Sequence, residues 1–179
     1  MRSLVLGLLL LTATPAAAEV LSAGPNGFEV QETVNLVAPQ ATAYAAFGQI
    51  GKWWNKEHTY SGDSARMSLQ LRAGGCLCEP LDDGGGIEHM RVSYLKPGEQ
   101  IVLTGSLGPL LYLATTGVMD VRFERIAGGT KVTMNYRAAG FAKSDGDKMA
   151  PLVDQVLADQ MKRYRTYAAS APKPDTLRP

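Results

Sequence analysis

Hydrophobic and polar residues alternate along several segments of the chain with a period of two, which is typical of strands with one buried face. Segment 28–37 places Val30, Val34 and Leu36 on one face, with Glu32 as the acidic exception on that face. The alternation predicts further strands, separated by turns that contain glycine, over 65–71, 76–81, 87–95, 100–104, 116–126 and 130–138.

Two segments carry a helical period instead. Segment 41–50 follows Pro39, which suits a first helical turn, and it ends at Gly51. The Trp53-Trp54 pair after it favours a second short helical turn. Segment 148–168 predicts a long amphipathic helix, because apolar residues recur at steps of three and four. Its apolar stripe consists of Leu152, Val153, Val156, Leu157, Met161 and Tyr164.

The order of these elements predicts an α+β domain. One strand, two short helices and about six further antiparallel strands precede a long C-terminal helix, which gives about seven strands in one sheet. An antiparallel sheet with one apolar face needs a cover, and the long helix has the matching stripe. A strongly curved sheet around one helix is expected to leave a hollow between the two layers.

The N-terminus has the pattern of a cleavable export signal. Arg2 precedes an apolar run over 4–11, and the small residues Ala16 and Ala18 suit a signal-peptidase site. The apolar run is shorter than the roughly 20 residues of a membrane span. We therefore expect a signal peptide over 1–18, a ligand-binding domain over 19–170 and a disordered tail over 171–179. The expected location is periplasmic or secreted.

Composition excludes several classes of partner. The chain has 18 Lys and Arg against 17 Asp and Glu. Removal of Arg2 with the signal peptide leaves these charges balanced, so neither nucleic acid nor an anionic membrane surface is an expected partner. Two cysteines are too few for a disulfide scaffold, so a hydrophobic core must hold the fold. No motif for a cofactor is present, and none is expected. The sequence leaves open whether the protein is a monomer or a weak dimer.

The chain resembles the START-like (SRPBCC) superfamily, which has the helix-grip fold. The closest branch is the polyketide cyclase/dehydratase and chaperone-ATPase-activator-like group. The resemblance covers roughly 28–167, and it is carried by segments 37–39, 53–62, 73–76, 85–89, 107–110 and 128–132. It implies a deep cavity beneath the C-terminal helix that accepts apolar or amphipathic small molecules. It does not imply one chemistry, because a fold of this kind hosts many functions.

A hairpin centred on Gly84 would place Cys78 opposite Met90 and Cys76 opposite Val92. Cross-strand partners point to the same side of a sheet. In that register the interior side chains are Cys76, Cys78, Met90, Val92 and Tyr94. The remaining charged residues Glu79, His89 and Arg91 would then form a cluster on the solvent face.

Cys76 and Cys78 allow three interpretations. They can be two buried thiols that act as small apolar groups. They can form a disulfide, although residues two apart in a strand lie near the upper limit of bridgeable separation. With Met90 they can form a soft-metal site of the type that suits Cu(I). We expect the first, and therefore no bound metal.

Three titratable residues are candidates for acid–base chemistry. His58 and Tyr60 follow the tryptophan pair, in a loop expected at the mouth of the cavity, and Glu57 or Glu88 can lie near that rim. The alternative is that His58 is an ordinary hydrogen-bonded loop residue. Glu32 faces inward in the predicted strand, so its carboxyl must be paired, protonated or near an opening.

These observations favour an exported protein that binds a small apolar, lipid or aromatic molecule between sheet and helix. The expected cavity walls are Trp53, Met67, Cys78, Met90, Tyr94, Leu103, Met119, Phe123, Val153, Leu157 and Met161. One alternative is a cyclase- or dehydratase-like enzyme that uses the acid–base candidates. Another is a protein-interaction module, in which segment 107–113 forms an exposed apolar patch. That segment can also be a lid or an edge of the core.

Overall fold

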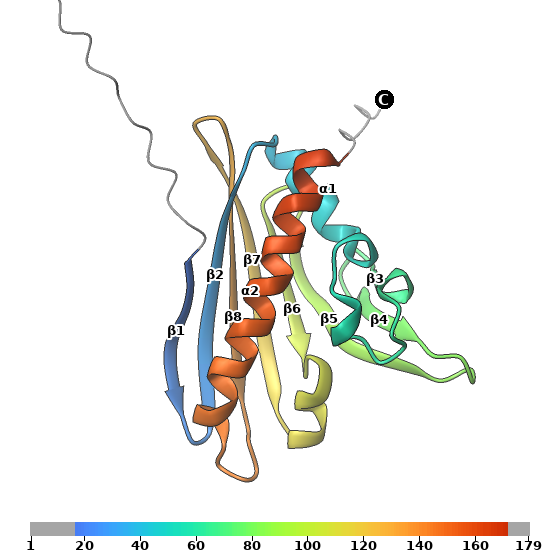
Figure 1. The fold of residues 1–179 in the computed structure, drawn as a ribbon, viewed down its shortest axis with the longest axis vertical. Coiled ribbons are helices and arrows are strands. Elements are labelled where there is room, and N and C mark those ends of the chain that lie inside the picture. Colours follow the sequence, from blue (N-terminus) through green and yellow to red (C-terminus); the bar gives the residue numbers. More distant parts are fainter. Residues whose placement is uncertain (1–16, 172–179) are drawn as a thin grey trace, which may run out of the picture.

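The computed structural model describes residues 17–171, which form one antiparallel sheet and a long C-terminal helix packed across it (Figure 1). The sheet has eight strands in the order β1-β2-β8-β7-β6-β5-β4-β3. Their bounds are β1 Ala17–Gly24, β2 Gly27–Leu36, β3 Ser68–Leu69, β4 Cys76–Pro80, β5 Gly86–Lys96, β6 Gln100–Gly105, β7 Thr116–Ile126 and β8 Gly129–Ala139.

The long helix α2 spans Gly146–Ser170, and the shorter α1 spans Gln40–Gly48. Four 3-10 segments complete the described chain: η1 Ile50–Lys52, η2 Lys56–His58, η3 Ser64–Arg66 and η4 Gly108–Leu113. The α+β prediction, with a curved sheet around a C-terminal helix, is confirmed as a helix-grip arrangement. The sheet has one strand more than expected, because β1 precedes the predicted first strand and pairs with it.

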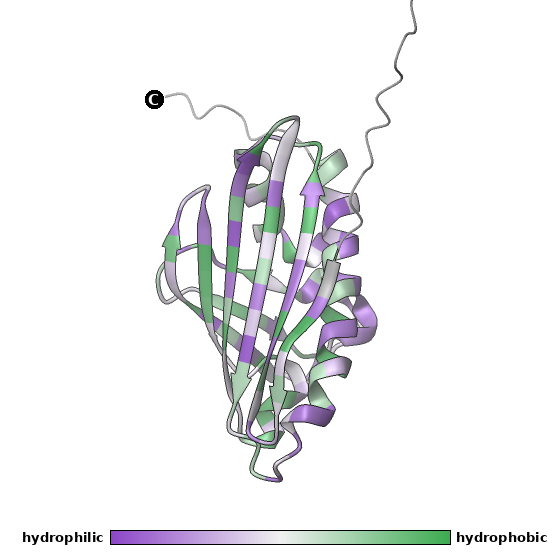
Figure 2. Ribbon diagram, turned by 90° about the vertical axis from the view of Figure 1, so that its left-hand side faces the viewer, coloured by the Kyte–Doolittle hydropathy of each residue, from purple (hydrophilic) through white to green (hydrophobic). Residues whose placement is uncertain are grey.

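Alternating side chains fix which face of the sheet is buried. Along β2, every second residue from Phe28 to Leu36 is buried, and bands of hydrophobic and hydrophilic residues alternate along the strands in Figure 2. Glu32 belongs to the buried set, as its register predicted, and only 3% of its surface is exposed. The apolar face of the sheet lies against α2, so hydrophobic burial between these two layers drives their packing.

Aromatic side chains fill the centre of the space between sheet and helix. Phe47 of α1 contacts Trp53, Phe123 and Tyr164, with ring centroids 5.3 to 5.8 Å apart. The Tyr164 hydroxyl donates a hydrogen bond to the Ala43 carbonyl (2.8 Å), which ties α2 to α1. The space between the sheet and this part of α2 is therefore solidly packed.

The predicted signal peptide and tail lie largely outside the described residues. Residues 1–16 and 172–179 are not described, so both segments stay predictions. Within residues 17–171, no helix is long and apolar enough to cross a bilayer. Ala17 and Ala18 already pair with Thr33 and Glu32 of β2, directly at the predicted cleavage point.

Candidate functional site

A cavity of about 410 Å³ lies beside the first half of α2, towards the end of the sheet where that helix begins. Four parts of the chain enclose it: the loop around η2, strand β5, the η4 segment and α2. Its volume falls within the range of small-molecule sites. The lining residues are Trp54, Glu57, His58, Thr59, Tyr60, His89, Leu107, Gly108, Pro109, Leu110, Met149, Leu152, Val153, Val156 and Leu157.

Most of this wall is hydrocarbon. The helix contributes Val153, Val156 and Leu157, while Leu107 and Leu110 face them from η4 and the residue before it. The polar residues of the η2 loop, Glu57, His58 and Tyr60, are largely exposed. An apolar molecule would therefore lose its hydration against the helix and η4, and the η2 loop would remain in contact with water.

The η2 loop is held by hydrogen bonds rather than by regular structure. Trp54 is buried, and its indole Nε1 donates to the His58 carbonyl (3.0 Å), which closes the loop. Asn55 caps η2, since its side-chain oxygen accepts from the Glu57 amide (3.1 Å). The Asn55 side chain also donates to Asp159 of α2 (2.8 Å), so the loop is anchored to the helix.

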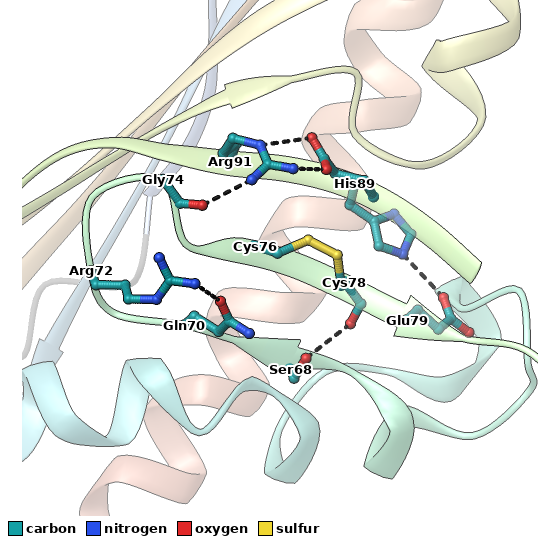
Figure 3. Close-up of a disulfide and its surroundings, with 10 residues drawn as sticks. Ser68, Gln70, Arg72, Gly74, Cys76, Cys78, Glu79, His89 and Arg91 are labelled. Carbon is teal, nitrogen blue, oxygen red and sulfur yellow. Dashed lines mark hydrogen bonds and ion pairs between the residues drawn. A yellow bond between two sulfur atoms is a disulfide. The ribbon is translucent and has the colours of Figure 1, made fainter. Parts of the chain in front are cut away.

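A buried histidine–carboxylate pair lies on strands β4 and β5. The Nε2 atom of His89 is 3.0 Å from Oε2 of Glu79, and the two residues are 3% and 1% exposed. Glu79 also accepts hydrogen bonds from the backbone amides of Tyr60 (3.1 Å) and Ser61 (2.5 Å). This carboxylate therefore joins the η2 side of the pocket to the sheet. Figure 3 shows its contact with His89.

Two opposing effects act on the Glu79 carboxyl. Burial raises its pKa, because desolvation disfavours the charged form. The hydrogen bonds from Ser61, Tyr60 and His89 outweigh burial and hold the pKa below its ordinary value. Glu79 is thus an ionised acceptor beside His89 at neutral pH.

The predicted hairpin register is wrong, because the hairpin is centred on Asp83 instead of Gly84 and a β-bulge interrupts its pairing. Leu77 pairs with Met90 and Cys78 pairs with Glu88, so His89 is an extra residue in β5. The bulge turns both His89 and Met90 towards the interior. In β4, Leu77 and Glu79 face inward, whereas the sequence predicted a solvent-facing cluster of Glu79 and His89.

Gly105 of β6 lies against this bulge. Its φ is +147°, and an added Cβ would lie 2.9 Å from both the His89 carbonyl oxygen and the Met90 Cα. The close approach of the two backbones therefore requires glycine at this position. The neighbouring strand helps to define where His89 points.

Cys76 and Cys78 form a disulfide on the outer face of β4 (Figure 3). Their Cα atoms are 5.3 Å apart, which is within the bridgeable range. The expectation of two buried thiols is therefore wrong. Cys78 does not line the cavity, because the register change moves it to the opposite face of the sheet.

The predicted soft-metal site of Cys76, Cys78 and Met90 also lacks its third ligand. Met90 is fully buried on the inner face, away from the disulfide. The group of metal-ligating atoms closest to the predicted set is formed by Cys76, Cys78 and Glu88, which lie within 4.8 Å of one another. The two cysteine sulfurs are bonded to each other, so neither is available as a thiolate ligand in the disulfide form.

The three acid–base candidates do not converge. His58 and Tyr60 line the pocket from exposed positions, whereas Glu32 lies in a separate hollow between β2 and α2 with Met161 and Lys162. Burial raises the pKa of Glu32 to about 8, and the nearby charge of Asp154 and a hydrogen bond with it add to this shift. Glu32 is therefore protonated at neutral pH, but it is not part of the pocket.

Of the predicted cavity walls, Val153 and Leu157 line the pocket. Tyr94 is 51% exposed, so its predicted inward orientation is wrong; a register irregularity between Val92 and Tyr94 turns it outward. Met161 borders the hollow of Glu32 instead. The other predicted wall residues are buried in the packed core: Trp53, Met67, Met90, Leu103, Met119 and Phe123.

The two adjacent tryptophans have different surroundings. Trp53 packs in the core and donates from Nε1 to the Ala46 carbonyl (3.1 Å). Trp54 is the tryptophan that lines the pocket.

In η4, Leu110 is 1% exposed, whereas Leu111 and Tyr112 are 50% and 73% exposed. Segment 107–113 is thus partly core and pocket wall, and partly surface.

Comparison with solved structures finds the same fold in several bacterial proteins. An uncharacterised protein from Rhizobium leguminosarum matches with a TM-score of 0.59 and 19% identity, over 87% of this chain and 98% of that one. A protein from Rhizobium loti matches with a TM-score of 0.58 and 17% identity, over 79% and 96%. At these identities the likeness concerns the fold.

A third structure has a described role. The di-domain aromatase/cyclase StfQ of the steffimycin biosynthetic pathway matches with a TM-score of 0.55 and 15% identity. The match covers 80% of this chain and 51% of StfQ, so this chain is similar to about half of that protein. No family model and no curated protein matches the sequence.

Proposed function

We propose that this protein binds a small apolar or aromatic molecule in the pocket beside the first half of α2. The pocket itself carries the proposal, because about 410 Å³ of space has an apolar wall from two directions. Such a wall favours ligands by removing their apolar surface from water. The fold shared with an aromatase/cyclase supports a site for ring-containing molecules.

We also propose that the protein acts after export, as a periplasmic or secreted carrier. The export pattern of residues 1–18 supports this location. The Cys76–Cys78 disulfide supports it as well, because disulfides persist in oxidising compartments. Removal of residues 1–18 would leave β1 paired with β2 from Glu19 onward.

Binding is favoured over acid–base catalysis by the layout of the predicted candidates. His58 and Tyr60 are exposed at the pocket, and Glu32 belongs to a different hollow. A catalytic acid and base must both reach the reacting atoms. These three residues do not share such a point.

The test is the binding of N-phenyl-1-naphthylamine, a neutral probe whose fluorescence increases in apolar sites. Wild-type protein is expected to bind it saturably. Val153→Trp fills the pocket from α2 and should weaken binding at least tenfold. Val118→Trp is the matched control on the outer face of β7, where Val118 is 40% exposed, and it should bind like wild type.

Native mass spectrometry of freshly purified protein complements the probe. A co-purified small molecule that is absent from Val153→Trp would support the proposal. If wild type shows neither a co-purified ligand nor saturable probe binding, the proposed function is wrong. Equal probe binding by both tryptophan variants would place the site elsewhere.

A further inference from the structure

His89 is the polar group most deeply buried in the pocket wall. It is 3% exposed and lines the pocket, whereas the other polar residues around the cavity come from the exposed η2 loop or are only partly buried. Its Nε2 atom bonds Glu79, but its Nδ1 atom is buried and has no hydrogen-bond partner within the described residues. Buried polar atoms are nearly always paired, so an unpaired one in a pocket-lining residue points to a missing partner.

The hydrogen bond to Glu79 defines the chemistry of that free nitrogen. Glu79 is an ionised carboxylate that already accepts two backbone amides, so it can only accept from His89. The proton of a neutral imidazole must therefore be on Nε2. Nδ1 is then a lone pair, and it can only accept a hydrogen bond.

The rigidity of this arrangement favours recognition. The bulge of β5 directs His89 inward, Gly105 packs against the bulge, and Glu79 fixes the plane of the ring. An acceptor that is held in place in an apolar wall distinguishes strongly between a ligand that can donate a hydrogen bond and one that cannot. Little ordering is then needed when the ligand binds.

We propose that Nδ1 of His89 accepts a hydrogen bond from a hydroxyl group of the bound molecule, so that the pocket selects phenols and related apolar alcohols. This inference rests on the proposed function, because it specifies the ligand class of the same pocket. Glu79 acts as a positioning residue, since it holds the imidazole tautomer and does not contact the ligand.

The direct test compares three probes of similar size at pH 7.5: 1-naphthol, 1-methoxynaphthalene and naphthalene. Wild type is expected to bind 1-naphthol about tenfold more tightly than 1-methoxynaphthalene, which lacks the donor. In His89→Leu this preference should vanish while naphthalene still binds. Tyr94→Leu, which changes an exposed residue of the same strand outside the pocket, should keep the preference.

A measurement on wild type covers the case in which His89→Leu does not fold. The chain has two histidines, so ¹⁵N NMR of the imidazoles resolves His89 by comparison with His58→Gln. Addition of 1-naphthol should shift the Nδ1 resonance of His89, and 1-methoxynaphthalene should not. An Nδ1 resonance that stays unchanged when 1-naphthol binds would overturn the inference.

The two proposals fail in different ways. If all three probes bind wild type equally well, the pocket binds apolar molecules, but His89 does not recognise a hydroxyl group. The inference about His89 is then wrong. If none of the three binds, the proposed function fails together with the inference.

Discussion

At the scale of single residues, two carboxyl groups are buried in the described part of the chain, Glu32 and Glu79, and their surroundings differ. The Glu79 carboxylate is hydrogen-bonded to Nε2 of His89 and accepts two backbone amides, so its charge is stabilised. Glu32 has no such donors, and burial together with Asp154 keeps its carboxyl group protonated at neutral pH. The local hydrogen bonds, rather than burial alone, decide which carboxyl is charged.

Glu32 should make stability depend on pH. Its pKa is raised from 4.5 to about 8 on folding, so the folded chain holds a proton that the unfolded chain has lost between these values. The contribution of Glu32 to the free energy of unfolding is therefore fully present below about pH 4.5, and it is lost as pH rises to about 8. Glu32→Gln should match wild type near pH 4.5, become relatively more stable up to pH 8, and then keep a constant advantage.

Urea unfolding at pH 5, 7 and 9 measures this effect. Glu29→Gln is the control, because Glu29 lies on the outer face of the same strand and pairs with Arg137. A constant difference between Glu32→Gln and wild type at all three pH values would contradict the assignment.

The disulfide should contribute modestly to stability. It closes a loop of only three residues, and the chain-entropy relation gives about 1.5 kcal/mol for such a loop. A chemical reductant should therefore lower the free energy of unfolding of wild type by about that amount. The Cys76→Ser/Cys78→Ser double variant should not respond to the reductant.

Mass spectrometry after alkylation checks the bond itself. Iodoacetamide should label neither cysteine in the denatured, unreduced protein, and both after reduction. Labelling without reduction would show that the two cysteines are thiols.

At the scale of elements, the hydrogen bond between Tyr164 of α2 and the Ala43 carbonyl of α1 offers a test of how the two helices are held together. Tyr164→Phe removes the buried hydrogen bond to the Ala43 carbonyl, so the variant should lose about 1–1.5 kcal/mol of stability. Tyr167→Phe, three residues along the same helix, removes an exposed contact with Gln49 and should lose less than 1 kcal/mol. Equal losses in urea unfolding would contradict this account.

The strands and helices also show how well hydrophobic periodicity predicts the bounds of an element. The predicted strand over 28–37 is observed as Gly27–Leu36, and the predicted helix over 148–168 as Gly146–Ser170, because side-chain alternation is a local property. Strand β4 shows where it fails. Cysteine, leucine and glutamate alternate there without a clear apolar face, so the sequence pattern favoured the wrong side.

At the scale of the whole molecule, export is the property that remains to be tested. Expression in a Gram-negative host should yield a periplasmic protein whose N-terminal residue is Glu19. Replacement of Ala16 and Ala18 by arginine should block cleavage and leave the precursor. Edman sequencing of the periplasmic fraction measures both outcomes, and an unprocessed wild-type chain in the cytoplasm would contradict the prediction.

By itself, the sequence determined the layout of this protein: the α+β order of elements, the curved sheet with a helical cover, and the inward position of Glu32. These follow from hydrophobic periodicity, which each segment carries locally. Only the tertiary structure decided the positions of His89, Glu79 and the disulfide. A one-residue bulge, against which Gly105 packs, changes the register between β4 and β5, and no local sequence pattern encodes it. The pocket lies towards the end of the sheet for a related reason, because aromatic residues from α1, β7, α2 and the loop after η1 meet and fill the centre.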